Sequence, residues 1–175
     1  HDHSFPGVDV AITDWPGIEA QTQAIQKSLD STLVAQICLV EEGRYGPEAQ
    51  VMLQNVAAGH SFPSGAAHDR RAWVELVAYK GDEIIHSSGV IDDETPAAHA
   101  PDLDLWLIRD IIFDENNEEA HMFWDADRAV SNLLAGMTTL HEIDEQGELI
   151  HFPVETRQIQ TYFLTEIPDR IAMKV

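Results

Sequence analysis

Histidines are the side chains of this chain best suited to chemistry, and nine occur among its 175 residues. His1 and His3 alternate in an extended N-terminal segment and so face the same side of it. His60 and His68 flank the turn Phe62-Pro63-Ser64-Gly65. Imidazole binds zinc and copper, and an acidic chain raises the local concentration of cations. One hypothesis is therefore a transition-metal site that uses His1, His3, His60 and His68. The simpler interpretation is a set of scattered loop histidines with ordinary hydrogen bonds.

A long acidic loop over residues 92–104 is the second candidate site. Carboxylate oxygens are the ligands that calcium prefers. The glycine and the final glutamate of an EF-hand loop are missing, so solvated surface charge is the favoured interpretation and calcium binding the alternative. The carboxylates concerned are Asp92, Asp93, Glu94, Asp102 and Asp104.

Hydrolytic chemistry is not indicated by the sequence. Ser64 lies between Pro63 and Gly65, but the Gly-x-Ser-x-Gly sequence that exposes a nucleophilic serine does not occur. Besides the metal hypothesis, no arrangement of residues supports catalysis. We therefore expect a protein that is not an enzyme.

The composition of the chain limits its partners and its class. Thirty-one acidic residues against ten basic ones give a formal charge of −21, which argues against nucleic-acid binding because phosphates would be repelled. The length suits one domain with a sizeable core, and the apolar runs are too short to span a bilayer. The one cysteine, Cys38, lies in an apolar run and is expected to be buried. Without a Cys-x-x-Cys-His motif, these residues cannot attach haem covalently.

A helix and then a series of strands are expected to position these groups. Ile18, Ile25 and Leu29 recur on one face of a helix over residues 17–30, and Pro16 suits its first turn, with Asp14 or a neighbour as the cap. From residue 32 onward, short strand-like runs alternate with turn signals. This pattern predicts a mainly β fold, an antiparallel immunoglobulin-like β-sandwich over residues 32–175, preceded by an extended segment and one N-terminal helix over residues 1–31.

Several elements of this sandwich can be specified further. Residues 32–41 are apolar on both faces, as in a central strand. Residues 105–114 are expected to form one strand, and residues 120–124 the strand that returns beside it. Trp73, Trp106 and Trp124 are expected to pack in the core. The other predicted strands span residues 51–56, 71–79, 83–88, 138–143, 149–154, 158–164 and 171–175.

Two stretches of this sequence resemble a known family. One is Asn55-Val-Ala-Ala-Gly-His-Ser-Phe-Pro-Ser-Gly65 with Asp69-Arg-Arg-Ala-Trp-Val-Glu75, and the other is the N-terminal segment 1–11. Together they resemble the non-haem region of bacterial multihaem c-type cytochromes, in which a helix and a β-sandwich follow the haem-attachment motifs. Residues 104–110, 121–124, 131–134 and 169–175 fit the same region, so the resemblance covers nearly the whole chain.

The resemblance implies a non-catalytic structural or docking module of a periplasmic multihaem cytochrome that takes part in electron transfer. The haem c would lie outside this chain, and the partner would be the haem-bearing region of the same or another protein. His1 and His3 would be the first candidates for axial ligands to those haems, and His60 the next. The alternative is an independent histidine-rich periplasmic protein that binds copper or zinc. The chain opens on His1 without a signal peptide, which leaves open a mature exported chain or a piece of a longer one.

Overall fold

The structure, a computed structural model, describes residues 13–92, 95–154 and 156–175. Within these residues the strands all pair antiparallel, and they follow one long helix. The elements are α1 (Ile18–Thr32), β1 (Leu33–Gly43), β2 (Gly46–Asn55), η1 (Ala67–Asp69), β3 (Trp73–Lys80), β4 (Glu83–Ser88), η2 (Ala97–His99), β5 (Trp106–Leu107), β6 (Asp110–Phe113), η3 (Phe123–Asp125), β7 (Arg128–Ser131), β8 (Thr138–Ile143), β9 (Leu149–Val154), β10 (Arg157–Phe163) and β11 (Arg170–Lys174), where η denotes a 3₁₀-helix.

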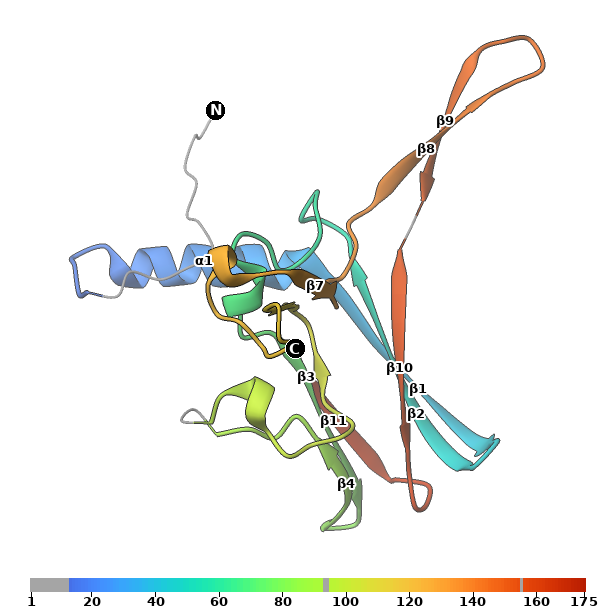
Figure 1. Cartoon of the computed structure of the whole chain (residues 1–175). Coiled ribbons are helices and arrows are strands. Elements are labelled where there is room, and N and C mark those ends of the chain that lie inside the picture. Colours follow the sequence, from blue (N-terminus) through green and yellow to red (C-terminus); the bar gives the residue numbers. More distant parts are fainter. Residues whose placement is uncertain (1–12, 93–94, 155) are drawn as a thin grey trace.

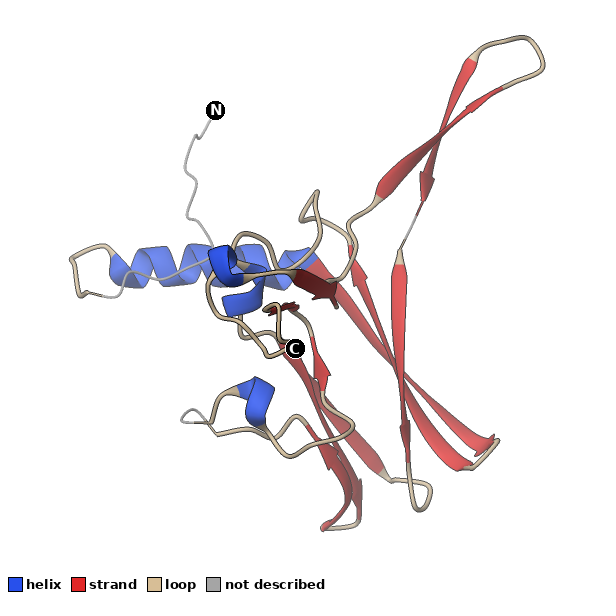
Figure 2. Ribbon diagram, viewed as in Figure 1, coloured by secondary structure: helices blue, strands red, loops and turns tan. Residues whose placement is uncertain are grey.

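Two antiparallel sheets form the body of the molecule (Figures 1 and 2). One has the strand order β1-β2-β10, and the other has the order β11-β3-β4, with β5 also paired to β3. The predicted antiparallel β-sandwich with one N-terminal helix is therefore confirmed. The hairpin β8–β9 projects from this body, and β6 and β7 form a further two-stranded sheet.

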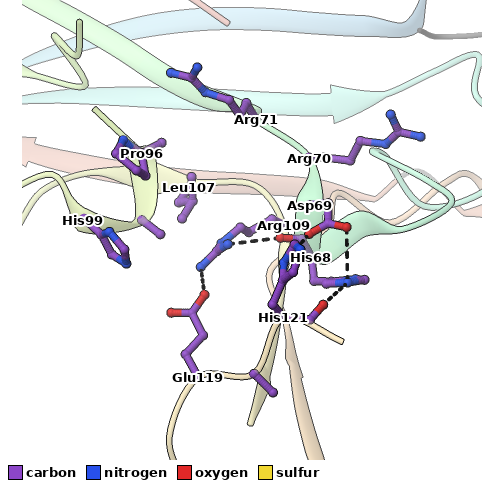
Figure 3. A pocket seen from close by; sticks show the side chains of 13 residues that line it. His68, Asp69, Arg70, Arg71, Pro96, His99, Leu107, Arg109, Glu119 and His121 are labelled. Carbon is purple, nitrogen blue, oxygen red and sulfur yellow. Dashed lines mark hydrogen bonds and ion pairs between the residues drawn. The ribbon is translucent and has the colours of Figure 1, made fainter. Parts of the chain in front are cut away.

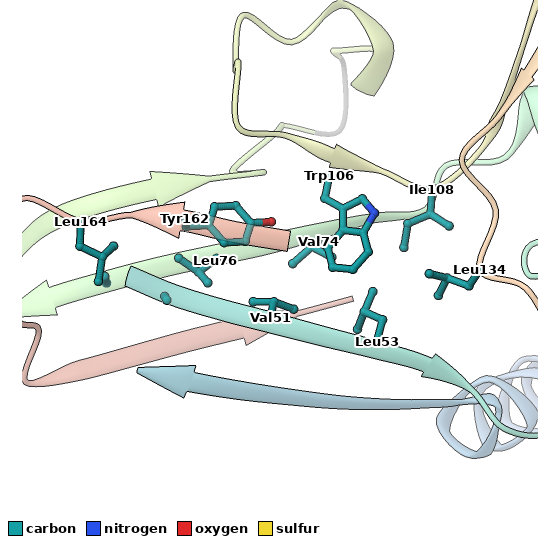
Figure 4. Packing of buried hydrophobic residues seen from close by; sticks show 11 residues of the cluster. Val51, Leu53, Val74, Leu76, Trp106, Ile108, Leu134, Tyr162 and Leu164 are labelled. Carbon is teal, nitrogen blue, oxygen red and sulfur yellow. The ribbon is translucent and has the colours of Figure 1, made fainter. Parts of the chain in front are cut away.

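The core lies between the two sheets, where each central strand turns a row of apolar side chains, two residues apart, toward the other sheet. Val51 and Leu53 of β2 face Val74 and Leu76 of β3, and all four side chains are fully buried (Figure 4). Burying such a side chain stabilises the fold by about 1.5–3 kcal/mol. The remaining members of the cluster are Ala49, Ala78, Trp106, Ile108, Leu134, Tyr162 and Leu164.

The helix α1 extends away from the sheets, and Ile25 is its buried residue (Figure 1). The predicted helix over residues 17–30 is confirmed and continues to Thr32, but its N-cap is Gly17 and no side chain caps it. At its other end, the Thr32 carbonyl accepts hydrogen bonds from the backbone of Val56 and Ala57. The helix end therefore fixes the start of the connection that follows β2. No helix in the described residues combines the length and the apolar character needed to cross a membrane.

The prediction of a central strand over residues 32–41 is wrong. The strand β1 forms there, but it lies at the edge of its sheet and pairs with β2. Leu33, Ile37 and Leu39 pack against the core, whereas Cys38 on the opposite face is exposed. The prediction of a buried Cys38 is therefore also wrong. An apolar run on both faces identified the strand, but this pattern did not reveal that one face is open to solvent.

The region of residues 105–131 also differs from the prediction. The expected strand over 105–114 is divided into β5, which pairs with β3, and β6, which pairs with β7. The return strand is β7, while residues 123–125 form η3 instead. Trp106 is buried as expected, but Trp124 is 78% exposed, so its predicted place in the core is wrong.

Candidate functional site

The turn after β2 is built around a buried asparagine. Asn55 is 1% exposed, and its side-chain amide donates to the carbonyl oxygens of His60, at 2.6 Å, and Leu134, at 3.3 Å. Its Oδ1 atom accepts a hydrogen bond from the backbone of Ala58, at 3.1 Å. Both N–H groups and the oxygen of this side chain therefore form hydrogen bonds that close the turn. A buried amide satisfied in this way holds its loop in one conformation.

The turn presents the His60 side chain to solvent. Gly59 precedes it with a φ of +72°, a conformation that other residues adopt at a cost. The Nδ1 atom of His60 lies 2.9 Å from the carbonyl oxygen of Ser61. A carbonyl oxygen only accepts, so Nδ1 must carry the proton of this bond. In the neutral imidazole, the lone pair is then on Nε2, which is the arrangement that metal-ligating histidines adopt.

A second segment packs against the turn and completes its support. Phe62 and Leu134 exchange two backbone hydrogen bonds of 2.8 Å, and the Phe62–Pro63 peptide bond is cis. Gly136 lies so close to the backbone of His60 that a Cβ atom there would approach it to 2.8 Å. The His60 turn is thus fixed from β2 on one side and from residues 134–136 on the other.

The connection then continues into η1, where a second histidine is buried. His68 is 6% exposed, and its Nε2 atom lies 3.0 Å from the carbonyl oxygen of His121, to which it donates. Arg109 donates to the carbonyl oxygen of His68 at 3.0 Å and forms an ion pair with Glu119. His68 therefore joins η1 to the loop that leads from β6 to η3.

Asp69 places the ring of a third histidine beside this contact (Figure 3). The Oδ1 atom of Asp69 lies 3.1 Å from Nδ1 of His121, and its Oδ2 atom lies 3.5 Å from Nε2 of His68. His121 is 73% exposed. The result is an exposed imidazole whose Nδ1 faces a carboxylate, next to a buried imidazole that anchors the same loop.

These groups border a cavity of about 370 Å³ between η1, η2 and the loop after β6 (Figure 3). Arg70 and Arg71 contribute to its rim, and each is fixed by a backbone carbonyl. The Nε atom of Arg70 donates to Ser64 at 3.2 Å, and Arg71 donates to Thr95 in the acidic loop at 3.4 Å.

The predicted metal and haem ligands are only partly covered by the structure. His1 and His3 lie outside the described residues. His60 and His68 are carried by the same connection, but one is exposed and the other is buried with its Nε2 occupied. Among the residues that the structure describes, no three His, Cys, Asp or Glu side chains are grouped to hold a metal ion.

Two carboxylates of the acidic loop, Asp92 and Asp102, accept hydrogen bonds from the chain, and Asp104 lies 4.0 Å from Nε2 of His86. Asp102 accepts from the Ser88 hydroxyl and from the backbone of Gly89, at 3.0 and 2.6 Å. Asp92 accepts from the backbone and the hydroxyl of Thr95. These bonds tie the loop to itself and to the end of β4. Asp93 and Glu94 lie outside the described residues.

His121, Arg109 and Glu119 were not predicted to belong to a site. His121 follows His68 by 53 residues, and no spacing rule connects them. The sequence shows only that His121 directly precedes three apolar residues, Met122, Phe123 and Trp124, and this does not indicate a partner for its ring. Only the fold brings this loop to η1.

Comparisons of the chain with protein-family models, with curated proteins and with solved structures find no match. The fold and the site define its class as an antiparallel β-sandwich that presents exposed histidines, His60 and His121, on its connections.

Proposed function

We propose that this chain is a non-catalytic β-sandwich module of a periplasmic multihaem c-type cytochrome, which supports or docks the haem-bearing region of the same or a partner protein. The proposal begins from the resemblance of residues 55–75 and 1–11 to that family. A periplasmic location follows, because haem c is attached outside the cytoplasm in such proteins. Electron transfer would take place in the haem-bearing part.

The observation that supports this proposal most is the state of His60. Its ring is exposed, its Nδ1 is bonded to the Ser61 carbonyl, and its turn is held by Asn55. An axial haem ligand needs an available Nε2 lone pair and a ring that does not rotate freely. The residues present therefore fit a haem iron, which would supply the redox chemistry when it is bound.

The rigidity of the turn gives the proposal a physical basis. A ligand that is already ordered loses little conformational entropy when it binds. Three hydrogen bonds from one buried side chain and two backbone bonds between Phe62 and Leu134 order this turn in the isolated chain. A solvated loop with no binding role would not require such a frame around one exposed imidazole.

The gene sequence upstream of the His1 codon provides the first test. We expect several Cys-x-x-Cys-His motifs in the same reading frame or in an adjacent gene. Expression of that region with the present chain, in a host that attaches haem c, should give a periplasmic protein with one haem per motif. An upstream region without such motifs, and no haem protein that copurifies from the native source, would refute the proposal.

A His60→Ala variant of that haem protein provides the second test. We expect one haem to change from low-spin to high-spin in its electron paramagnetic resonance spectrum, because it loses an axial ligand. His99→Ala is the matched control, since His99 is also exposed and lies on η2. Identical spectra for the wild type and the His60→Ala variant would remove His60 from the set of ligands and leave His1 and His3 to be tested.

A further inference from the structure

The outer edge of β10 leaves part of its backbone without partners. Among the described strands, β10 pairs with β2 alone and ends its sheet (Figure 1). The backbone N–H of Leu164 donates to the Pro47 carbonyl at 2.8 Å, so these two residues form a hydrogen-bonded pair. Hydrogen-bonded and non-hydrogen-bonded pairs alternate along an antiparallel ladder. The backbone groups of Ile159, Thr161 and Phe163 therefore point to the open edge, where they have no hydrogen-bond partner among the described residues.

This edge carries little of what protects edge strands from pairing, which is proline, charged side chains or a bulge. β10 contains neither proline nor lysine, and its one charged residue, Arg157, is at its start. Its register with β2 runs without a shift from Arg157 to Phe163. On its outer face, Ile159 and Phe163 are 61% and 52% exposed. An added strand would satisfy the open backbone groups and cover apolar surface.

A cavity of about 500 Å³ adjoins β10 and is lined by its residues Gln158 and Gln160. The Nε2 atom of Gln158 donates to the Leu133 carbonyl at 2.8 Å, and that of Gln160 donates to the Asp104 carbonyl at 3.4 Å. Because a carbonyl oxygen only accepts, these bonds orient both amides. Each side-chain oxygen is left without a partner among the described residues. The one ionisable side chain of the lining is the carboxylate of Asp102, so the cavity offers acceptors and negative charge.

The remaining wall of this cavity includes apolar side chains, among them Leu105, Leu107 and Ile111. Lysine and arginine combine an apolar stem with a charged head that only donates hydrogen bonds. The stem would contact the apolar wall, and the head would meet the oxygens of Asp102, Gln158 and Gln160. The formal charge of −21 also attracts a basic segment and opposes pairing with a second copy of the chain.

We infer that β10 is a docking edge for an extended segment of a partner protein, which adds as a strand beside Ile159, Thr161 and Phe163. A lysine or arginine side chain of that segment enters the adjoining cavity. The backbone hydrogen bonds provide affinity, and the basic side chain provides specificity. This inference goes beyond the proposed function, because it holds whether or not the partner carries haem.

The test uses the whole chain and a synthetic peptide as the probe, acetyl-Thr-Val-Thr-Arg-Thr-Val-Thr-amide. Titration calorimetry at pH 7 should give a complex of one peptide per chain. Thr161→Pro should lower the affinity about 10-fold or more, because it removes an N–H that faces the open edge while the pairing with β2 does not use this N–H. Thr161→Val retains the N–H and should bind the peptide as the wild type does.

Ala35→Pro is the matched control on the other edge of the same sheet. Ala35 is exposed, and the bond from Val56 to the Thr32 carbonyl shows, by the same alternation, that its N–H faces the open edge of β1. This variant should bind the peptide with wild-type affinity. The proline variants and the wild type have the same charge, so general attraction to an acidic chain does not distinguish them. Thermal unfolding curves check that each variant is folded.

The role of the basic side chain is tested separately. A peptide with citrulline, which has nearly the shape of arginine but no charge, should bind about 10-fold more weakly. Asp102→Asn should weaken the binding of the arginine peptide and change that of the citrulline peptide by less than about 2-fold, because the two charges act as a pair.

The inference is overturned if the wild type does not bind the arginine peptide, if Thr161→Pro and Ala35→Pro bind it equally, or if citrulline has no effect. It is also overturned if sedimentation shows a dimer that Thr161→Pro converts to a monomer, since a second copy of the chain would then occupy the edge. These outcomes are independent of the haem-attachment motifs and spectra that test the proposed function, so either proposal can fail without the other.

Discussion

The side-chain nitrogen of Asn55 lies 2.6 Å from the carbonyl oxygen of His60. This bond joins the last residue of β2 to the residue whose ring the turn exposes. The same nitrogen reaches Leu134, which is 79 residues later in the chain. One buried amide therefore connects the core, the exposed histidine and a distant segment, so the position of His60 depends on Asn55.

Replacement of Asn55 by alanine should destabilise the fold. The change removes three hydrogen bonds and leaves the buried carbonyl of Leu134 without this donor. We expect the free energy of unfolding to fall by about 2–4 kcal/mol. Urea denaturation measures this difference. Asn116→Ala, at an exposed turn, is the control and should change stability by less than about 0.5 kcal/mol. Equal effects of the two substitutions would contradict the role assigned to Asn55.

Gly89 and Gly59 form a matched pair for a test of close packing. Both have a φ near +70°. A Cβ atom on Gly89 would overlap the carbonyl oxygen of Val74, whereas a Cβ atom on Gly59 would have no other heavy atom within 4 Å. Gly59→Ala should cost about 1 kcal/mol for its backbone conformation alone. Gly89→Ala should cost about 3 kcal/mol or more, because overlap is added. Similar thermal unfolding temperatures for the two variants would show that the approach to Val74 is not close.

Tyr162 should make the protein sensitive to alkaline pH. Its ring is fully buried, and its hydroxyl has no hydrogen-bond partner among the described residues. Burial, with Asp102 and Asp104 nearby, raises the pKa of Tyr162 well above its ordinary value of 10. The unfolded chain therefore loses this proton first, and stability should fall by about 1.4 kcal/mol per pH unit above pH 10.

The variant Tyr162→Phe tests this origin of the pH dependence. At pH 7 it should be within about 1 kcal/mol of the wild type or more stable, because an unsatisfied buried hydroxyl is removed. Urea denaturation at pH 7 and pH 11 should show a smaller loss for the variant than for the wild type. A loss of the same size in both proteins would assign the alkaline sensitivity to other groups.

Cys38 should react as a surface thiol. The structure exposes it on the outer face of β1, where a thiol reagent can reach it without unfolding. We expect one thiol per chain to react with a chromogenic disulfide reagent in native buffer, the same number as in denaturant. Cys38→Ser should change the free energy of unfolding by less than about 0.5 kcal/mol. A reaction that requires denaturant would show that Cys38 is buried after all.

Much of the fold could be predicted from local patterns. Strand-like runs between turn signals identified β3, β10 and part of β2, and the predicted strands over residues 138–143 and 149–154 have the bounds of β8 and β9. The order of the strands in each sheet could not be predicted from these patterns. An apolar run such as that of β1 looks the same in a central and an edge strand, because its pattern contains no information on what covers each face. The division of residues 105–114 likewise depends on partners far away in the chain.

The candidate site was predictable only where its residues are close in sequence. Asn55 and His60 belong to one turn, and the sequence drew attention to that turn through its glycines and proline. His121 approaches Asp69 because β6 packs against η1 and places the following loop there. This approach is a tertiary contact between residues more than fifty positions apart, and hydrophobic periodicity does not report such contacts.

The connection between β2 and β3 carries His60 near its beginning and Asp69, whose carboxylate lies 3.1 Å from Nδ1 of His121, near its end. Hydrogen bonds fix its backbone at three places: from Asn55 to His60, between Phe62 and Leu134, and from Arg70 to Ser64. The position of the His60 ring is therefore set by the sandwich before any neighbour arrives. Under the proposed function, the partner must bring its metal centre to this ring, because the turn that carries the ring is already ordered.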